Sequence, residues 1–221
     1  MTVMDQIDAL VARRRLLDHP FYTAWTKGEL TREALEQYAA QYYHWVEAFP
    51  TFLSAVHANC ESLQVRQVIL DNLIDEEKGA ENHPELWLRF CDALGLDREA
   101  VRRGDLLPET RAAIMSYKTL CRTSIPVAAL AAIYAYESQQ PSVMASKRAG
   151  LADRYAITRG HDYFVQHETI DVEHSAAERD LVLAGAEGHE AEIGRAVSQG
   201  LEATYTLLDG IHQRYVAGTA A

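Results

Sequence analysis

The stretch HETIDVEHSAAE, residues 167–178, places two histidines and an aspartate at His167, Asp171 and His174. No glycine or proline interrupts it, so the sequence predicts one continuous helix there. On a helix, positions i, i+4 and i+7 lie within about 60° of one another, so the three side chains are expected to share one face. Imidazole and carboxylate on adjacent turns suit iron, manganese or zinc. The alternative is an ordinary polar face with solvated histidines.

A second segment, LIDEEKGAENHPELW at residues 73–87, supplies further ligands. Glu76 lies seven residues before His83, so the pair shares a face if the backbone stays helical between them. Gly79 and Pro84 favour a break instead, with Pro84 beginning a new helix and His83 at its N-terminal boundary. A solvated acidic helix end is the alternative without function.

The segment SIPVAALAAIYAYESQQP, residues 124–141, is the most apolar helix that the sequence predicts. Its only charge is Glu137. A carboxylate on such a helix is costly to bury unless it is paired or binds a metal. The alternative is that Glu137, in the last turn before Pro141, points to water.

Together the three segments offer three carboxylates and three imidazoles, the donors that a dinuclear iron or manganese site requires. The candidate ligands are Glu76, His83, Glu137, His167, Asp171 and His174. Structural zinc sites favour Cys/His tetrahedra, and the three cysteines form no such pattern. We expect Cys60, Cys91 and Cys121 to be buried reduced thiols.

The elements that must position these residues are helices almost throughout. Apolar residues recur every three or four positions, and strand-like alternation is scarce. Glycine and proline predict breaks that give roughly eight to ten helices; these breaks fall at Pro20, Gly28, Pro50, Gly79–Pro84, Gly95, Gly104–Pro108, Pro141, Gly150 and Gly185–Gly188. We predict one all-α domain over residues 1–221, a helical bundle of the kind that builds metal sites between facing helices.

Composition narrows the classes of function. The 221 residues carry a net charge of −11, which disfavours nucleic acid or an anionic membrane as the main partner. No window reaches the roughly 18 apolar residues of a membrane span, and no secretory signal is visible, so we expect a cytoplasmic protein. An apolar stripe on the last predicted helix is compatible with a homodimer.

Several segments resemble the haem-oxygenase-like dimetal oxidases, whose fold is shared with TenA-like and PqqC-like proteins. They are HPFYTAW, YYHWVEAFPTFLSAVHANC, NLIDEEKGAENHPELW, YAYESQ and HETIDVEHS. The likeness runs from about Pro20 to Glu178 and is strongest for the branch typified by the Chlamydia protein associating with death domains, regarded as a 4-aminobenzoate synthase of folate biosynthesis. The fold class alone would not assign a function.

The resemblance implies specific roles. All six candidate ligands match the family pattern and would hold an Fe/Fe or Fe/Mn centre that uses dioxygen and an external reductant. In the 4-aminobenzoate branch the protein consumes one of its own tyrosines, which corresponds to Tyr22, with Lys147 as amino donor. Tyr38, Tyr136 and Tyr163 would lie near the metals and carry a radical. From the sequence alone, tyrosines such as Tyr38 and Tyr42 on an amphipathic helix more often pack in a core.

Two alternatives stay open at this point. An oxidase of the same fold can act on an external small molecule, such as a fatty acid or an amino-acid derivative. A non-enzymatic interaction protein is the other, although an interaction module has no need of six converging ligands.

Overall fold

The computed structural model describes residues 2–219, and this part of the chain contains helices and no strand, which confirms the all-α prediction. Twelve α-helices and two short 3₁₀ helices follow one another: α1 (Val3–Arg13), η1 (Leu16–Asp18), α2 (Pro20–Lys27), α3 (Arg32–Asn59), α4 (Leu63–Glu77), α5 (His83–Ala93), α6 (Arg98–Arg103), α7 (Pro108–Thr123), α8 (Pro126–Glu137), α9 (Gln140–Asp153), α10 (Asp162–His167), α11 (Ile170–Gly185), α12 (Glu190–Tyr215) and η2 (Ala217–Thr219). The predicted number was too low because helices as short as α6 and α10, six residues each, give almost no periodic pattern.

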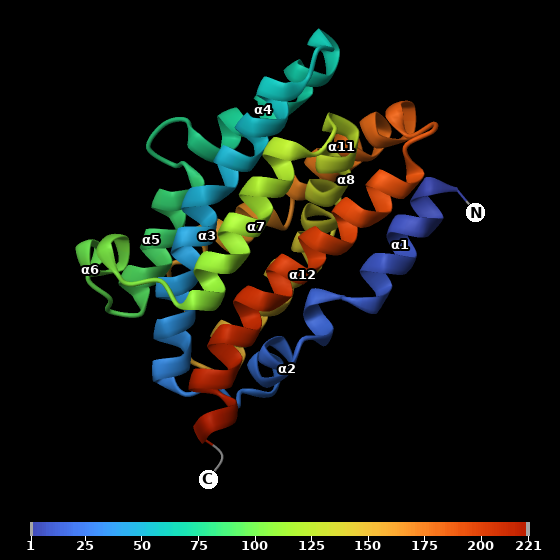
Figure 1. The fold of residues 1–221 in the computed structure, drawn as a ribbon. Coiled ribbons are helices and arrows are strands. Elements are labelled where there is room, and N and C mark those ends of the chain that lie inside the picture. Colours follow the sequence, from blue (N-terminus) through green and yellow to red (C-terminus); the bar gives the residue numbers. More distant parts are fainter. Residues whose placement is uncertain (1, 220–221) are drawn as a thin grey trace.

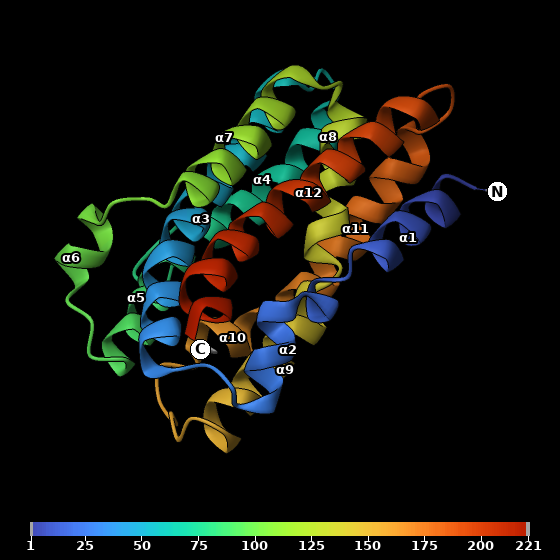
Figure 2. The ribbon, with the colours of Figure 1, turned by 60° about the horizontal axis from the view of Figure 1, so that its bottom comes forward.

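The longer helices form a bundle around α12. Figures 1 and 2 show α12 between α7 and α8, with α3 beside α7 and α11 beside α8. Helix α4 packs against α3, and α1 lies along α12. The shorter α2, α9 and α10 gather with α5 toward one end (Figure 2). The ends of α4, α8 and α10 and the start of α11 therefore meet inside the bundle.

Buried hydrophobic side chains form one continuous cluster through these helices. Helix α8 lies at its centre, and every residue from Ala128 to Glu137 is buried. One cluster supports the proposal of one domain over residues 1–221, of which residues 1, 220 and 221 lie outside the described part. Cys60, Cys91 and Cys121 are buried and unpaired, as predicted.

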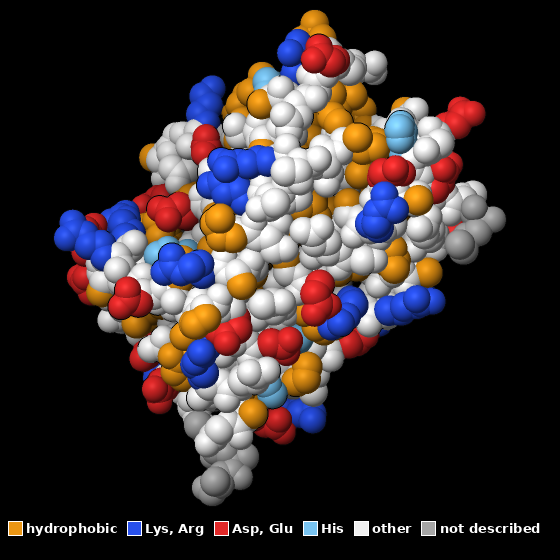
Figure 3. All heavy atoms as spheres, in the orientation of Figure 1, with side chains coloured by type: hydrophobic (Ala, Val, Ile, Leu, Met, Phe, Trp, Pro, Cys, Tyr) orange, Lys and Arg blue, Asp and Glu red, His pale blue; other side chains and the backbone are white. Residues whose placement is uncertain are grey.

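The surface carries both signs of charge. Figure 3 shows acidic and basic side chains interspersed over the face formed by α3, α7 and α12, with hydrophobic side chains gathered around α4. On α4, Leu63 is 61% exposed and Leu70 is 42% exposed. Among the described residues, no helix combines the length and the hydropathy needed to cross a bilayer.

The predicted helix break at Pro50 is wrong, because Pro50 lies inside α3. Proline in a helix interior costs about 3 kcal/mol through the lost hydrogen bond and the ring clash. The residues that follow it, Phe52, Leu53 and Val56, are at most 1% exposed. Burying each such side chain stabilises the fold by about 1.5–3 kcal/mol, so packing outweighs the cost of the proline.

The predicted break at Gly150 is also wrong, since Gly150 lies inside α9. A Cβ at this position would stand 2.6 Å from Nε1 of Trp25, on α2. The glycine therefore lets α2 and α9 approach closely, which is a packing role and not a helix-ending one.

Candidate metal centre

The six candidate ligands lie at helix ends that converge in the bundle. Five of the six are buried and His174 is partly exposed. Glu76 is in the last turn of α4, His83 begins α5, Glu137 ends α8, His167 ends α10, and Asp171 and His174 lie in the first two turns of α11. The backbone is not helical between Glu76 and His83, and a new helix begins at His83 with Pro84 in its first turn, as one of the two predictions had it. The prediction that Glu137 points to water is wrong, because that residue is 2% exposed.

Glu76, His83 and His167 each offer a donor atom within 4.8 Å of the others. Nδ1 of His83 lies 2.7 Å from Oε2 of Glu76. This contact is an ion pair when the imidazole is protonated, and Nε2 of His83 has no hydrogen-bond partner in the described part of the chain. Buried polar atoms without partners are rare in proteins. Two imidazoles and a carboxylate converging in this way fit a divalent cation.

The other three side chains extend this cluster. Glu137 and Asp171 line the same cavity as Glu76 and His167. Nδ1 of His174 lies 3.9 Å from Oδ1 of Asp171. Oδ2 of Asp171 and Nδ1 of His174 have no hydrogen-bond partner within residues 2–219. The structure thus brings all six side chains together, and their role as ligands stays a proposal.

The electrostatics of the cluster also suit cations. Burial raises the pKa of Asp171 well above its usual value, and the neighbouring carboxylates of Glu137 and Glu76 raise it further. Burial likewise raises the pKa of Glu137. Burial and the neighbouring His83 hold the pKa of His167 well below its usual value, which favours the neutral imidazole that binds metals. Divalent ions would offset the repulsion between the carboxylates.

Hydrogen bonds orient two of the imidazoles. Nδ1 of His167 lies 2.7 Å from the carbonyl oxygen of Tyr163, whose ring stacks on that of His167 with centroids 3.9 Å apart. A carbonyl only accepts, so Nδ1 carries the hydrogen and Nε2 keeps its lone pair. Nε2 of His174 lies 3.1 Å from Oδ2 of Asp75. Donation to this carboxylate leaves the Nδ1 lone pair of His174 facing Asp171, an arrangement common around metal-bound histidines.

Two buried polar residues beside the cluster were not predicted. The side-chain amide of Asn72 donates to Oε1 of Glu137 at 3.1 Å and to Oε1 of Glu178 at 3.5 Å. Glu178 is 3% exposed, and burial raises its pKa well above the usual value. The signal was available, because Glu178 follows Asp171 by seven residues and His174 by four, which places it on the same stripe of α11.

The prediction of one helix over residues 167–178 is wrong at one point. Helix α10 ends at His167 and α11 begins at Ile170. The hydroxyl of Thr169 donates to the carbonyl of Gln166 at 3.0 Å, and its backbone N–H bonds the same carbonyl. Such side-chain bonds compete with the helical pattern. The ligands therefore come from two consecutive helices.

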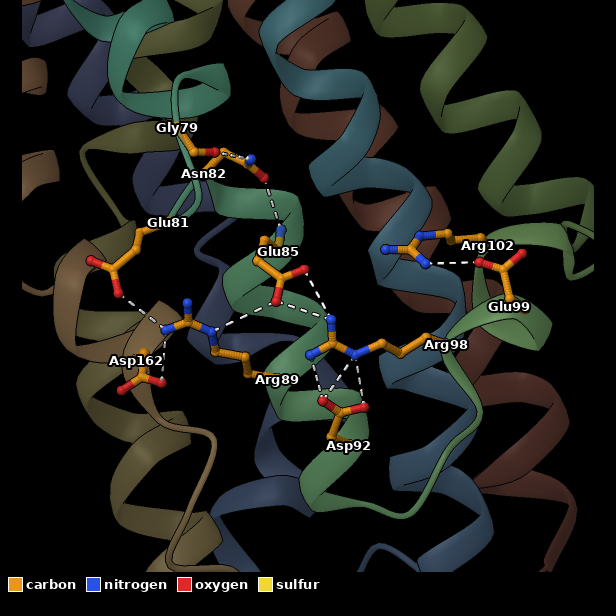
Figure 4. A network of polar contacts seen from close by, with 10 residues as sticks. All are labelled: Gly79, Glu81, Asn82, Glu85, Arg89, Asp92, Arg98, Glu99, Arg102 and Asp162. Atoms are coloured by element: carbon orange, nitrogen blue, oxygen red, sulfur yellow. Dashed lines mark hydrogen bonds and ion pairs between the residues drawn. The ribbon is translucent and has the colours of Figure 1, made fainter.

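The start of α5 is anchored by a polar network, drawn in Figure 4. Oδ1 of Asn82 accepts the backbone N–H of Glu85 at 3.0 Å and caps the helix. Arg98, at the start of α6, lies 3.0 Å from Glu85, and Arg89 lies 3.7 Å from Asp162, at the start of α10. These contacts tie together the two helices whose ends supply the converging imidazoles.

Lys147 lies in the core next to this centre and is fully buried. No carboxylate pairs with it among the described residues, and burial holds its pKa well below the usual value. Aromatic rings surround the amine, with Nζ-to-centroid distances of 4.7 Å to Tyr42, 5.2 Å to Tyr22, 5.3 Å to Tyr38 and 5.8 Å to Trp87. A neutral amine in such surroundings keeps a nucleophilic lone pair.

The tyrosines form two hydrogen-bonded pairs. The hydroxyls of Tyr22 and Tyr38 lie 3.2 Å apart, and those of Tyr42 and Tyr136 lie 2.7 Å apart. The rings of Tyr38 and Tyr42 pack with centroids 5.2 Å apart, and Tyr136 lines the cavity of the metal ligands. Tyr42, expected only to pack, thus connects the two pairs.

The helical bundle with its buried carboxylates and imidazoles defines a haem-oxygenase-like redox enzyme. The chain belongs to the family described as iron-containing redox enzyme, which matches residues 36–209. Membership of this family favours an enzyme over an interaction protein.

Several relatives are called 4-aminobenzoate synthase. The protein from Nitrosomonas europaea is 41% identical and the match covers 98% of this chain and 93% of that protein. The protein from Chlamydia muridarum is 37% identical over 95% of this chain and 89% of its own length. A TenA homologue from P. horikoshii superposes with a TM-score of 0.80 at 12% identity, covering 96% of this chain and 99% of the homologue. This structure confirms the predicted fold.

Proposed function

We propose that the chain is an oxygen-dependent dimetal oxidase that makes 4-aminobenzoate from the side chain of Tyr22, with Lys147 as the amino donor. The observation that carries this proposal is the fully buried Lys147 amine, unpaired with any described carboxylate and 5.2 Å from the centre of the Tyr22 ring. The names of the relatives support the product.

The six candidate ligands would hold two metal ions, Fe/Fe or Fe/Mn. Buried donor atoms without hydrogen-bond partners on three of them, His83, Asp171 and His174, support this assignment. With dioxygen and an external reductant, such a centre supplies the oxidising equivalents that the reaction needs. We also predict that the protein is cytoplasmic and forms a homodimer.

The structure of the product dictates what the protein residues must do. The Cα–Cβ bond of Tyr22 must break and Cβ must become the carboxylate carbon, with dioxygen as the source of the new carboxylate oxygens. The Cε–Nζ bond of Lys147 must break as its nitrogen replaces the phenolic oxygen on the ring, and that oxygen leaves as water. The lowered pKa of Lys147 favours the neutral amine that can attack or donate. The hydroxyl pairs and ring contacts of Tyr136, Tyr42 and Tyr38 would relay oxidation to Tyr22 through tyrosyl radicals, and Tyr163 is a second carrier at the metal ligands. Each chain would react once.

The cavities favour an internal ring over an external substrate. The space beside the metal ligands is about 10 Å³, and the space lined by Tyr22 and Tyr136 is also about 10 Å³. Either volume is about the minimum that one water molecule requires. A fatty acid or an amino-acid derivative would require the helices to move apart.

The test combines growth and mass measurement. Wild-type protein should rescue a 4-aminobenzoate auxotroph, Tyr22→Phe and His174→Ala should not, and Tyr215→Phe serves as the matched control. After reaction with metal, reductant and oxygen, peptide masses of the wild type should show loss of the tyrosine side chain at position 22 and loss of the amine nitrogen at position 147. An intact Tyr22 alongside newly formed 4-aminobenzoate would exclude it as the ring source, and turnover of an added substrate would favour the external alternative.

A further inference from the structure

A groove of about 270 Å³ lies between α4 and α11, beside the candidate ligand His174. Its lining includes four carboxylates and no lysine or arginine. The polar residues that line it are Asp71, Asn72, Asp75, Glu173, His174 and Glu178. A hollow with this lining favours cations.

The outer carboxylates of the groove are uncompensated. Asp71 and Glu173 are exposed, and the carboxylate of neither has a hydrogen bond or ion pair within the described part of the chain. By contrast, Glu85 and Asp92 on α5 are both held by Arg98. Carboxylates without a basic partner leave a negative potential at the mouth of the groove.

The groove leads to the candidate ligands. His174 lines it and is the most exposed of the six, with 11% of its side chain accessible. Nε2 of His174 contacts Asp75 at 3.1 Å, while the amide of Asn72 holds Glu137 at 3.1 Å. The proposed centre therefore comes nearest to solvent at this groove.

Buried oxygen atoms on the groove wall point independently to a ligand. Asn72 is 4% exposed and Glu178 is 3% exposed. Oδ1 of Asn72 and Oε2 of Glu178 have no hydrogen-bond partner in the described part. Oxygen donors of this kind are ligands for Mn²⁺ and other hard divalent cations.

We propose that this groove is the uptake site through which divalent iron or manganese reaches the centre. The ion first binds the carboxylates of Asp71, Asp75 and Glu173. It then passes Asn72 and Glu178 to the imidazole of His174. The oxidation state of the ion does not change in this step, because the ion only exchanges bound water for carboxylate oxygens. The inference rests on the proposed metal centre and does not depend on the identity of the substrate.

The test measures Mn²⁺ uptake by the metal-free full chain after rapid mixing, from the loss of the aqueous Mn²⁺ signal in electron paramagnetic resonance. The variant Asp71→Asn/Glu173→Gln removes two charges at the groove. The control Asp153→Asn/Glu187→Gln changes the net charge equally on exposed residues outside the groove. At low salt the groove variant should take up Mn²⁺ roughly tenfold more slowly, with weaker dependence on NaCl and the same final amount bound.

Three results would overturn the proposal: wild-type rates in the groove variant, equal slowing in the control, or a lower final amount bound without slower uptake. The last result would place Asp71 or Glu173 in the centre itself. Charge reversal with Asp71→Lys/Glu173→Lys should slow uptake further. A different result would separate the two proposals. If the wild type takes up Mn²⁺ normally and the groove variant takes it up more slowly, but the loaded wild type makes no 4-aminobenzoate, the proposed function is contradicted and the groove assignment stands.

Discussion

The hydroxyl oxygens of Tyr42 and Tyr136 lie 2.7 Å apart inside the buried aromatic cluster. Tyr136 lines the cavity of the candidate ligands. The ring of Tyr42 packs on Tyr38, whose hydroxyl lies 3.2 Å from that of Tyr22. Tyr42 therefore joins two tyrosine pairs into one path between the proposed metal centre and the proposed ring source.

Replacing Tyr42 by phenylalanine should interrupt this path. Tyr42→Phe keeps the ring packing and removes one neutral hydrogen bond, worth about 1 kcal/mol of stability. Phenylalanine cannot form a tyrosyl radical, so single-turnover formation of 4-aminobenzoate should slow by at least about tenfold. Tyr136 keeps a bond from Nε1 of Trp45 at 3.0 Å, which protects the fold. Product is measured by mass spectrometry, with metal content determined in parallel.

The matched control is Tyr43→Phe, since the hydroxyl of Tyr43 bonds Glu47 at 3.0 Å and not another tyrosine. An unchanged rate in Tyr42→Phe would mean that oxidation reaches Tyr22 by another route. A loss of bound metal would instead give Tyr42 a structural role.

Asp75 is a positioning residue for His174 in this structure. Asp75→Asn retains the shape but replaces the carboxylate that accepts from Nε2 of His174. Loss of such a partner lowers metal affinity by about 10–100-fold. Equilibrium titration of the metal-free protein with Mn²⁺ measures the change, and Glu77→Gln on the same helix is the exposed control. Equal affinities for wild type and Asp75→Asn would show that His174 is held without this contact.

Four of the candidate ligands could be predicted from the sequence because of their residue types and spacing. Glu137 is the only charge in an apolar helix, and His167, Asp171 and His174 follow a helical spacing. The roles of Tyr22 and Lys147 came only from family resemblance. Lys147 is followed by Arg148 in the sequence, and nothing local indicates that only the lysine is buried.

The remaining features depend on contacts between helices that are distant in the sequence. Asn72 reads as an ordinary polar residue until α4 packs beside α8 and α11 and its amide meets Glu137. The helix through Pro50 continues because residues on both sides are buried against other helices. A local sequence pattern predicts where a helix begins and ends, but it does not predict which other helices will pack against it.

Gly150 provides a test of the close approach between α2 and α9. In Gly150→Ala the new Cβ would lie 2.6 Å from Nε1 of Trp25. Overpacking of this kind costs about 1–3 kcal/mol, whereas alanine improves helix propensity by at most about 1 kcal/mol. The variant should therefore lose roughly 1–2 kcal/mol in urea unfolding, while the exposed control Ala149→Ser stays within about 0.5 kcal/mol. A more stable Gly150→Ala would contradict the close contact.

The buried amine of Lys147 predicts a pH-dependent stability. Unfolded, the lysine has its ordinary pKa of 10.5, and burial lowers the folded pKa well below that value. Between the two pKa values the unfolded chain binds one more proton, so the contribution of Lys147 to the unfolding free energy rises with pH across this window. Lys147→Met removes the penalty. At pH 7 the metal-free variant should be more stable by at least about 1 kcal/mol, or 2–4 °C in Tm, and its advantage should shrink as the pH approaches 10.5. An advantage that stays constant from pH 7 to 10.5 in urea unfolding would show that Lys147 reaches solvent and is not held as a neutral donor.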